Sequence, residues 1–160
     1  MLVVFSTVCF TASVAQVRIG AFLANGTEIE RWGIGANAEF FLNEKMAIQP
    51  NLLFYFPETV GDYKFSYWEL NGDFHYYFLA EDVVSLYGKA GLNFMTFKVK
   101  YDGPSTGFDV SGSDSEVGVN LGIGANFNVG GVLPFAELKY VLGEADQAVI
   151  SLGVKFPIKE

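Results

Sequence analysis

The chain carries little charge and almost no cysteine. Only 18% of its 160 residues are Asp, Glu, Lys or Arg, whereas soluble domains carry about 25%. The single cysteine, Cys9, lies near the start of the chain. A disulfide framework and a cysteine metal site are therefore excluded, and we expect no cofactor and no bound metal.

Basic residues are the scarcer of the two charged classes. The chain has 10 Lys and Arg against 18 Asp and Glu, which gives a net charge of -8. Binding to the phosphates of a nucleic acid needs a basic face. The composition therefore argues against a nucleic-acid partner.

Long hydrophobic runs are also missing. Although 51% of the residues are apolar, no segment reaches the ~18 uninterrupted apolar residues of a transmembrane helix. A hydrophobic protein without such a run must spread its apolar residues along the chain, and alternation along strands is one way to do so.

The first residues have the character of a leader. Leu2–Phe10 is apolar, and Ser13-Val14-Ala15 places small residues at positions -3 and -1 before Gln16. This pattern indicates a signal-peptidase site, although the basic residues that usually precede the apolar segment are missing. We expect residues 1–15 to be a signal peptide and residues 16–160 to be one domain.

From Gln16 onward the sequence alternates with the two-residue period of a β-strand. Residues 117–129 show it best, because every odd position there is apolar and every even position is Gly or Asn. A helix would scatter these apolar residues around its surface. The same split occurs in seven further segments: 17–24, 31–42, 45–56, 69–78, 84–94, 134–140 and 147–156.

Most of these segments have ten residues or more, the length of a tilted strand that crosses a bilayer, about 9–11 residues. Ordinary strands average about 5–6 residues. The sequence therefore predicts an all-β fold, an eight-stranded antiparallel up-and-down transmembrane β-barrel. Pro50 and Pro134 fall within these segments, and we expect them at bulges or strand ends because proline removes a ladder hydrogen bond.

Two pentapeptides are identical, Gly33-Ile-Gly-Ala-Asn37 and Gly122-Ile-Gly-Ala-Asn126. In both, Gly and Asn occupy the polar phase. Either a duplication or a shared demand for small inward residues in a narrow barrel would explain them.

Short and long connections alternate along the chain. The tight turns are 43–44, 81–82 and 130–131, and the longer polar connections are 25–30, 57–62, 102–115 and 143–146. Outer-membrane barrels have short periplasmic turns and longer external loops. We therefore expect the long connections to face outward, with both termini on the periplasmic side.

Aromatic residues in the apolar phase gather toward both ends of the strands, as in the interfacial girdles of membrane barrels. The expected external girdle comprises Trp32, Phe54, Phe56, Trp68, Phe94 and Tyr140, and the expected periplasmic girdle comprises Phe40, Tyr76, Phe78, Phe127 and Phe156.

The polar phase carries charges of both signs. An eight-stranded barrel has an interior just filled by side chains, and buried charges must be paired. We therefore predict an ion-pair network in the lumen, formed by Arg18, Arg31, Glu39, Glu69, Asp73, His75, Lys89, Glu116, Glu137, Lys139 and Lys155. The network is either a polar plug or the lining of a gated pore.

His75 is the only histidine, and within this set it would pair with Asp73 or Glu69. One histidine makes neither a metal cluster nor a catalytic triad, so no catalytic, cofactor or metal site is predicted. The long connection 102–115 is rich in acidic and hydroxyl residues. We interpret it as a solvated surface loop that presents itself to surface partners.

With these residues in view, the chain resembles the small outer-membrane barrels of the OmpA transmembrane-domain and OmpX type, also called the outer-membrane protein β-barrel domain or porin family. The resemblance covers Gln16 to about Ile158 and rests on the leader, the eight alternating segments and the last strand, Ala148 to Phe156. Members usually end on an aromatic residue, whereas here Phe156 is followed by Pro-Ile-Lys-Glu.

The resemblance implies a bacterial outer-membrane protein, with outer-membrane lipids as partners and a monomeric state. We expect a structural or surface-interaction role, in membrane integrity, adhesion or defence through the external loops. The alternatives are a soluble lipocalin-like ligand-binding barrel and a narrow channel or lipid-modifying membrane enzyme.

The same resemblance implies that the chain is not an enzyme, because its pattern includes no catalytic motif. The lipocalin-like alternative would place the apolar face of each strand inward and the charged face outward, the reverse of a membrane barrel.

Overall fold

The computed structural model describes residues 16–101, 111–143 and 146–158, and in these ranges the secondary structure consists of strands joined by turns. No helix in these ranges is long and apolar enough to cross a membrane. The strands are β1 (Val17–Gly26), β2 (Arg31–Phe41), β3 (Met46–Tyr55), β4 (Glu58–Val60), β5 (Tyr63–Ala80), β6 (Val84–Tyr101), β7 (Ser111–Phe127), β8 (Leu133–Leu142) and β9 (Gln147–Ile158).

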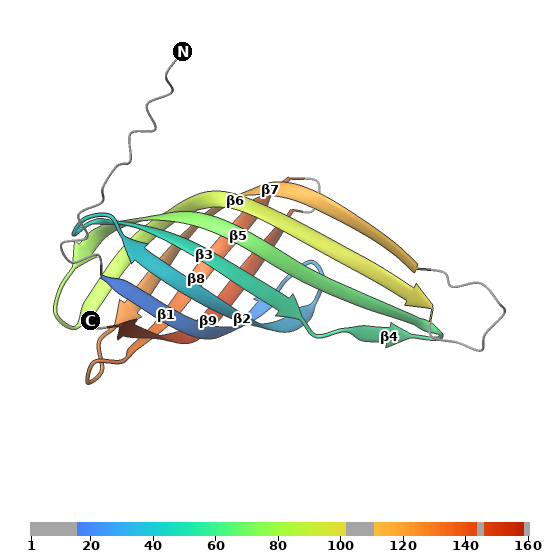
Figure 1. Cartoon of the computed structure of the whole chain (residues 1–160), viewed down its shortest axis with the longest axis horizontal. Coiled ribbons are helices and arrows are strands. Elements are labelled where there is room, and N and C mark those ends of the chain that lie inside the picture. Colours follow the sequence, from blue (N-terminus) through green and yellow to red (C-terminus); the bar gives the residue numbers. More distant parts are fainter. Residues whose placement is uncertain (1–15, 102–110, 144–145, 159–160) are drawn as a thin grey trace, which may run out of the picture.

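Eight of these strands form a closed antiparallel barrel (Figure 1). Consecutive strands pair with one another, β9 returns to pair with β1, and β3 pairs with β5. The three-residue β4 adds to the far end of β5, outside the closed ring. The predicted up-and-down topology is therefore confirmed.

The two faces of the barrel wall have opposite polarity. Ile123 and Leu152 on the outside are 61% and 57% exposed, whereas Asn120 and Lys155 on the inside are 0% exposed. A surface of exposed aliphatic and aromatic side chains can face lipid, while the polar side chains satisfy one another in the lumen. This is the arrangement of a membrane barrel and the reverse of a lipocalin-like carrier.

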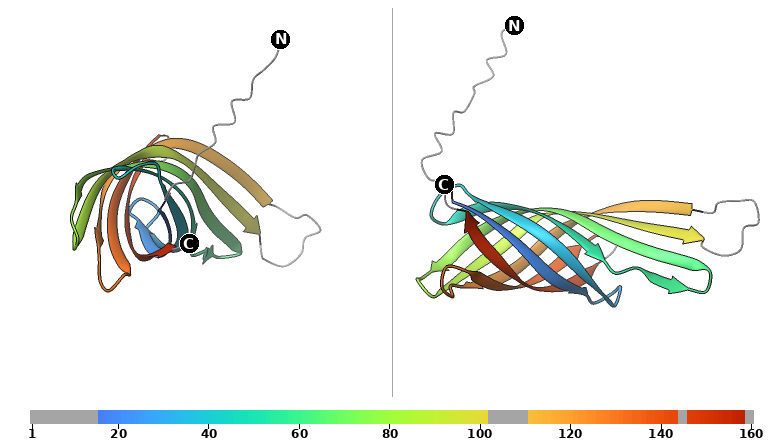
Figure 2. Two further views of the ribbon diagram at one scale, coloured as in Figure 1. Left: turned by 60° about the vertical axis from the view of Figure 1, so that its left-hand side comes forward. Right: turned by 60° about the horizontal axis from the view of Figure 1, so that its bottom comes forward.

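The wall is uneven in height. β5, β6 and β7 have 18, 18 and 17 residues, whereas the other barrel strands have 10 to 12. β7 pairs with β8 only over 119–126, and β5 pairs with β3 only from Trp68 onward. The upper parts of β5, β6 and β7, with β4 beside them, therefore extend past the rim as a projecting sheet (Figure 2).

Three predicted loops are too long. Residues 25–26 of the expected loop 25–30 end β1, residues 58–60 of the expected loop 57–62 form β4, and residues 111–115 of the expected loop 102–115 form the start of β7. Residues 111–115 pair in register with β6, up to Lys100 opposite Ser111. Residues 102–110 lie outside the described residues. The alternation signal is lost here because the outward residues turn from apolar to Ser, so that both phases look polar.

The two prolines behave differently from each other. Pro134 lies at the second position of β8, as expected for a strand end. Pro50 lies inside β3, and the expectation of a bulge or strand end is wrong there, because the registers to β2 and β5 continue unshifted past it. Pairing with β5 includes Pro50, whereas pairing with β2 is interrupted between Asn51 and Ile48. Two register positions are unpaired on the β2 side, Gln49 and Pro50, where proline has no N–H to donate.

The turns at one end are tight, as predicted. Gly130 and Gly131 have φ angles of 63° and 87°, which fits the left-handed conformation that two-residue hairpins demand. The β-bulge between Tyr77 and Leu79 lies at this same end of the barrel. β9 ends there too, opposite the projecting sheet (Figure 1).

Candidate functional site

The lumen is filled by charged and amide side chains. Four cations and four carboxylates have inward side chains and form ion pairs across the barrel: Arg18, Lys89, Lys139 and Lys155 with Glu39, Glu69, Asp73 and Glu137. Their formal charges cancel. Because buried charges are costly unless paired and hydrogen-bonded, this balance allows so polar an interior to be stable.

The first group of contacts surrounds Glu39 on β2. Its carboxylate accepts hydrogen bonds from the Tyr77 hydroxyl at 2.7 Å and from Arg18 at 3.2 Å. Lys155 lies 3.4 Å from the same carboxylate. Four strands are thereby tied together through one fully buried acidic side chain.

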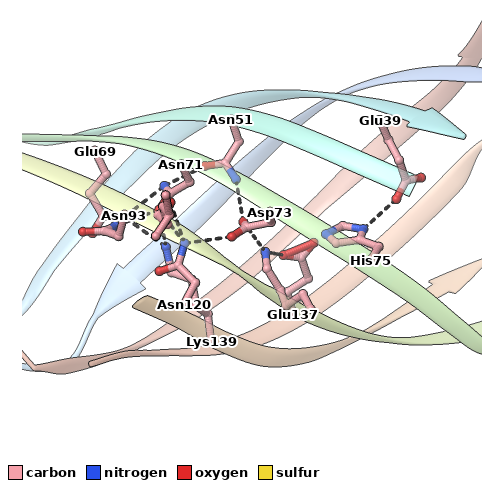
Figure 3. Close-up of polar contacts among 12 residues, drawn as sticks. Glu39, Asn51, Glu69, Asn71, Asp73, His75, Asn93, Asn120, Glu137 and Lys139 are labelled. Carbon is pink, nitrogen blue, oxygen red and sulfur yellow. Dashed lines mark hydrogen bonds and ion pairs between the residues drawn. The ribbon is translucent and has the colours of Figure 1, made fainter. Parts of the chain in front are cut away.

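His75 completes this group. Its Nδ1 atom lies 2.8 Å from Glu39, and its ring stacks on Tyr87 with centroids 4.5 Å apart. The prediction that His75 pairs with Asp73 or Glu69 is wrong. These two residues lie on the same strand as His75, two and six residues away, so their side chains are beside the His75 side chain and do not face it. Glu39 instead reaches His75 across the lumen (Figure 3).

A second group surrounds Glu69, where Lys139 donates at 3.0 Å and the Tyr55 hydroxyl at 2.8 Å. An amide ladder extends from it across the lumen (Figure 3). Asn93 and Asn120 donate to the Asn71 carbonyl oxygen at 2.7 and 2.9 Å. These amides satisfy carboxylate and amide oxygens that would otherwise be buried without partners.

Lys89 joins two further acids between these groups. Its ammonium lies 2.7 Å from Glu137 and 3.1 Å from Asp73. The Tyr87 hydroxyl also donates to Glu137, at 2.6 Å, and Asn120 donates to Asp73 at 2.8 Å. The network therefore runs through the barrel from the Glu39 group to the Glu69 group.

Two residues of the predicted network lie outside it. Arg31 is at the rim, where it pairs with Glu58 of β4 and lies over the Tyr67 ring, 5.3 Å from the centroid. Glu116 is half-buried on the inner face of β7 and makes no ion pair with any described residue. Arg31 is the first residue of β2, and Glu116 lies on the part of β7 that has no partner on β8, so both are at or beyond the upper edge of the closed ring.

Sequence reasoning left out the neutral members of the network. The amides Asn51, Asn71, Asn93 and Asn120 and the phenols Tyr55, Tyr77 and Tyr87 carry most of its hydrogen bonds. Their signal was available, because each occupies the inward phase of its strand. This signal was weak for two reasons. Neutral Asn and Tyr side chains need no oppositely charged partner, and a polar residue in the inward phase does not by itself indicate a network.

An apolar cluster closes the external half of the lumen. Leu53, Val141 and Val149 are buried there near the upper ends of the short strands, together with Met95 of the long strand β6, and Tyr67 packs against them. This cluster was also unexpected. Below it, the cavity lined by Gln49, Lys89, Glu137 and other residues has a volume of about 10 Å³, room for about one water molecule.

The expected girdle residues lie on the lipid-facing side of the wall. Ten of the eleven are 40% exposed or more, and Trp68 is half-buried. Trp32, Phe54 and Trp68 lie near the rim from which the sheet projects, and Phe40, Phe78 and Phe127 lie near the tight turns.

On the projecting sheet the polarity of the two faces is reversed. The inner face carries the cross-strand pairs Tyr63–Tyr101 and Tyr67–Phe97, with ring centroids 5.4 and 6.2 Å apart. The outer face carries polar pairs instead, Lys64 opposite Lys100 and Ser66 opposite Lys98. Side-chain alternation continues without a break from the barrel, so the change marks where the outer face leaves the hydrocarbon.

Comparison with known proteins gives a consistent picture. The family model described as the outer membrane protein beta-barrel domain matches residues 8–156. No curated protein matches the chain. Among solved structures, the N-terminal β-barrel domain of Pseudomonas aeruginosa OprF is similar, with 20% identity, a TM-score of 0.69, and 90% of this chain and 98% of that chain covered.

Two further structures share the fold. Ail, the attachment invasion locus protein of Yersinia pestis, in complex with the heparin analogue sucrose octasulfate, has 19% identity, a TM-score of 0.64, and coverage of 90% of this chain and 97% of that chain. Neisserial surface protein A has 16% identity, a TM-score of 0.63, and coverage of 91% and 96%.

Proposed function

Because the chain belongs to the outer membrane protein β-barrel domain family and is a bacterial outer-membrane barrel, we propose that it anchors the projecting sheet as a surface-interaction element. The barrel supplies the membrane anchor, and the inner aromatic face of the sheet supplies the contact surface. The polar plug of the lumen serves rigidity, and we propose no enzymatic role, since the only hydrogen-bond partner of His75 among the described residues is Glu39.

The observation that carries this proposal is the aromatic inner face of the projecting sheet, above the membrane band. Tyr63 on this face is 45% exposed, and Tyr101, Phe65 and Val99 beside it are half-buried. Aromatic side chains are enriched at protein interfaces, and exposed apolar patches mark interaction sites. In the same fold, Ail carries the name of an attachment protein, which supports a role in adhesion.

The proposal also includes the leader and the oligomeric state. We propose that residues 1–15 are removed on export and that the barrel is a monomer in contact with outer-membrane lipids. The N-terminal residue of the exported protein tests whether residues 1–15 are removed. N-terminal sequencing should begin at Gln16, and a chain that retains Ser13 would contradict it.

The test of function uses a shortened sheet. Residues 97–114 are replaced by Asn-Gly, so that Thr96 and Ser115, which pair in the intact protein, flank a two-residue hairpin. Cells of a laboratory Gram-negative strain that display the shortened protein should lose retention on polystyrene and on cultured epithelial cells. The folded barrel should persist, as shown by a gel mobility that changes on boiling.

A paired substitution separates the two faces. Tyr63→Ser with Tyr101→Ser removes an aromatic pair from the inner face, and Lys64→Ser with Lys100→Ser is its matched control one position along the same strands. We expect the tyrosine variant to reduce retention several-fold and the lysine variant to leave it unchanged. Full retention by both the shortened protein and the tyrosine variant would leave only a structural role in the membrane.

A further inference from the structure

The charges of the projecting sheet are segregated by face. Its lysines, Lys64, Lys98 and Lys100, are all on the outer face, which continues the lipid-facing wall. The described carboxylates of the same strands above the rim are on the inner face: Glu58, Asp114 and Glu116. In a chain of net charge -8, this leaves one basic surface whose lysines form no ion pair with a described carboxylate, Asp62 in the turn before β5 included.

These lysines are also set apart from the other basic residues. Four of the ten basic residues are paired in the lumen, Arg31 pairs with Glu58, and Lys45 lies in a turn at the opposite end of the barrel. Lys159 lies outside the described residues. Every described cation above the rim that is not in an ion pair therefore belongs to this one face.

The lysines are placed in a way that favours a bound anion. Lys64 is directly opposite Lys100 across β5 and β6, and Lys98 is the next outward residue. Like charges directly opposite in a sheet repel each other, and an anion between them would remove this cost.

Hydroxyl groups surround the lysines. Ser66 and Thr96 are on the same face of β5 and β6, and Ser113 and Ser115 are on the same face of β7. The Thr96 and Ser115 hydroxyls lie 3.0 Å apart. Ammonium groups and hydroxyls together suit an anion whose carrier is itself rich in hydroxyls, such as a phosphorylated sugar.

The patch also lies at the right height for a lipid headgroup. Trp68, Phe94 and Val117 end the apolar band on the same face. Lys64 and Lys98 are four residues beyond Trp68 and Phe94 on their strands, about 10 Å above the band for a strand tilted by about 45°. The headgroup layer is about 5–8 Å deep, and a lysine stem lets its ammonium reach back into that layer.

We propose that Lys64, Lys98 and Lys100 bind the phosphates of a membrane lipid with a phosphorylated saccharide headgroup in the external leaflet. The basic face thus contacts the leaflet surface on the side of the projecting sheet opposite the inner aromatic face. The lipid and the surface partner occupy opposite faces, so the failure of one assignment does not entail failure of the other.

The test uses the full mature chain folded in a nonionic detergent. Native mass spectrometry measures its binding of diphosphoryl lipid A and of the same lipid without phosphates. We expect the phosphorylated form to bind preferentially. Lys64→Gln, Lys98→Gln and Lys100→Gln combined should weaken its binding roughly a hundredfold, since basic residues near an anionic membrane surface each contribute about fivefold.

Two controls separate a face-specific site from the effect of net charge. Lys45→Gln removes a positive charge at the opposite end, and Asp114→Asn with Glu116→Gln removes two negative charges from the inner face. Both should leave binding within about twofold. Gel mobility before and after boiling shows that each variant is folded.

Three results would overturn the proposal. The first is equal binding by the triple variant and the unmodified chain, and the second is equal binding of the two forms of lipid A. The third is displacement of lipid A by millimolar inorganic phosphate, which would assign the lysines to free phosphate instead of a lipid.

Discussion

At the scale of single residues, Glu39 is the carboxylate of the described lumen network that pairs with the most cations, Arg18 and Lys155. It lies on β2, is 0% exposed, and contacts side chains of three other strands, β1, β5 and β9, through hydrogen bonds and ion pairs. Removing one partner from a buried charge group leaves the others without compensation. Its effect on stability should therefore exceed that of any exposed carboxylate.

The substitution Glu39→Gln tests this, because it keeps the shape of the side chain and removes its charge. We expect the free energy of unfolding to fall by about 3 kcal/mol, since Lys155 and Arg18 lose their carboxylate. Urea unfolding in lipid vesicles, followed by tryptophan fluorescence, measures the change. Glu44→Gln, in an exposed turn, is the control and should change it by less than about 0.5 kcal/mol. Equal urea midpoints for both variants would show that the network contributes no net stability.

At the scale of strands, the two identical pentapeptides have the same structural role. Gly35 pairs with Phe22 and Gly124 pairs with Tyr87, and in both cases the aromatic ring lies where a glycine Cβ would be. The lumen is so narrow that an inward aromatic ring needs a neighbour without a side chain. The shared demand for small inward residues accounts for the repeat without a duplication.

Gly124→Val should therefore disrupt the wall locally. A side chain there would displace the Tyr87 ring and its hydrogen bond to Glu137, and overpacking of this kind costs about 1–3 kcal/mol. The urea midpoint measures the loss. Gly88→Val, next to Tyr87 on β6, is the matched control, because no atom lies within 4 Å of its Cβ position. A similar loss in both variants would mean that glycine is needed for the backbone and not for the ring.

At the scale of the whole molecule, the girdles set the position of the barrel in the bilayer. The chain has two tryptophans, and both Trp32 and Trp68 lie near the rim of the projecting sheet. Tryptophan prefers the interface between hydrocarbon and headgroups. The external edge of the hydrocarbon should therefore lie at these two residues.

Depth-dependent quenching checks this placement. In vesicles of lipids brominated at successive chain positions, we expect the strongest quenching from bromines near the headgroup. The single-tryptophan variants Trp32→Phe and Trp68→Phe report on one residue each, and Trp68 should be quenched less because it is half-buried. Strongest quenching by bromines at the bilayer centre would contradict the proposed position of the girdles.

Much of the architecture was predictable from local pattern. The two-residue period identified the lipid-facing and inward residues of β2, β7 and β9, and the alternation of turns identified the topology. The pattern failed above the rim, at Ser111–Ser115, because a strand surrounded by water on its outer face has no need for apolar residues there. The alternation of apolar and polar residues therefore could not predict the length of the projecting strands.

The sequence by itself determined the barrel, its orientation of faces and the charged content of the lumen, because each of these follows from which phase of a strand a residue occupies. Only the tertiary structure decided which side chains contact each other. Glu39 meets His75 across the lumen, and Lys64 meets Lys100 on the outer face. Such contacts depend on strand register and on how the barrel closes. Register and closure bring together residues that are far apart along the chain at no regular spacing.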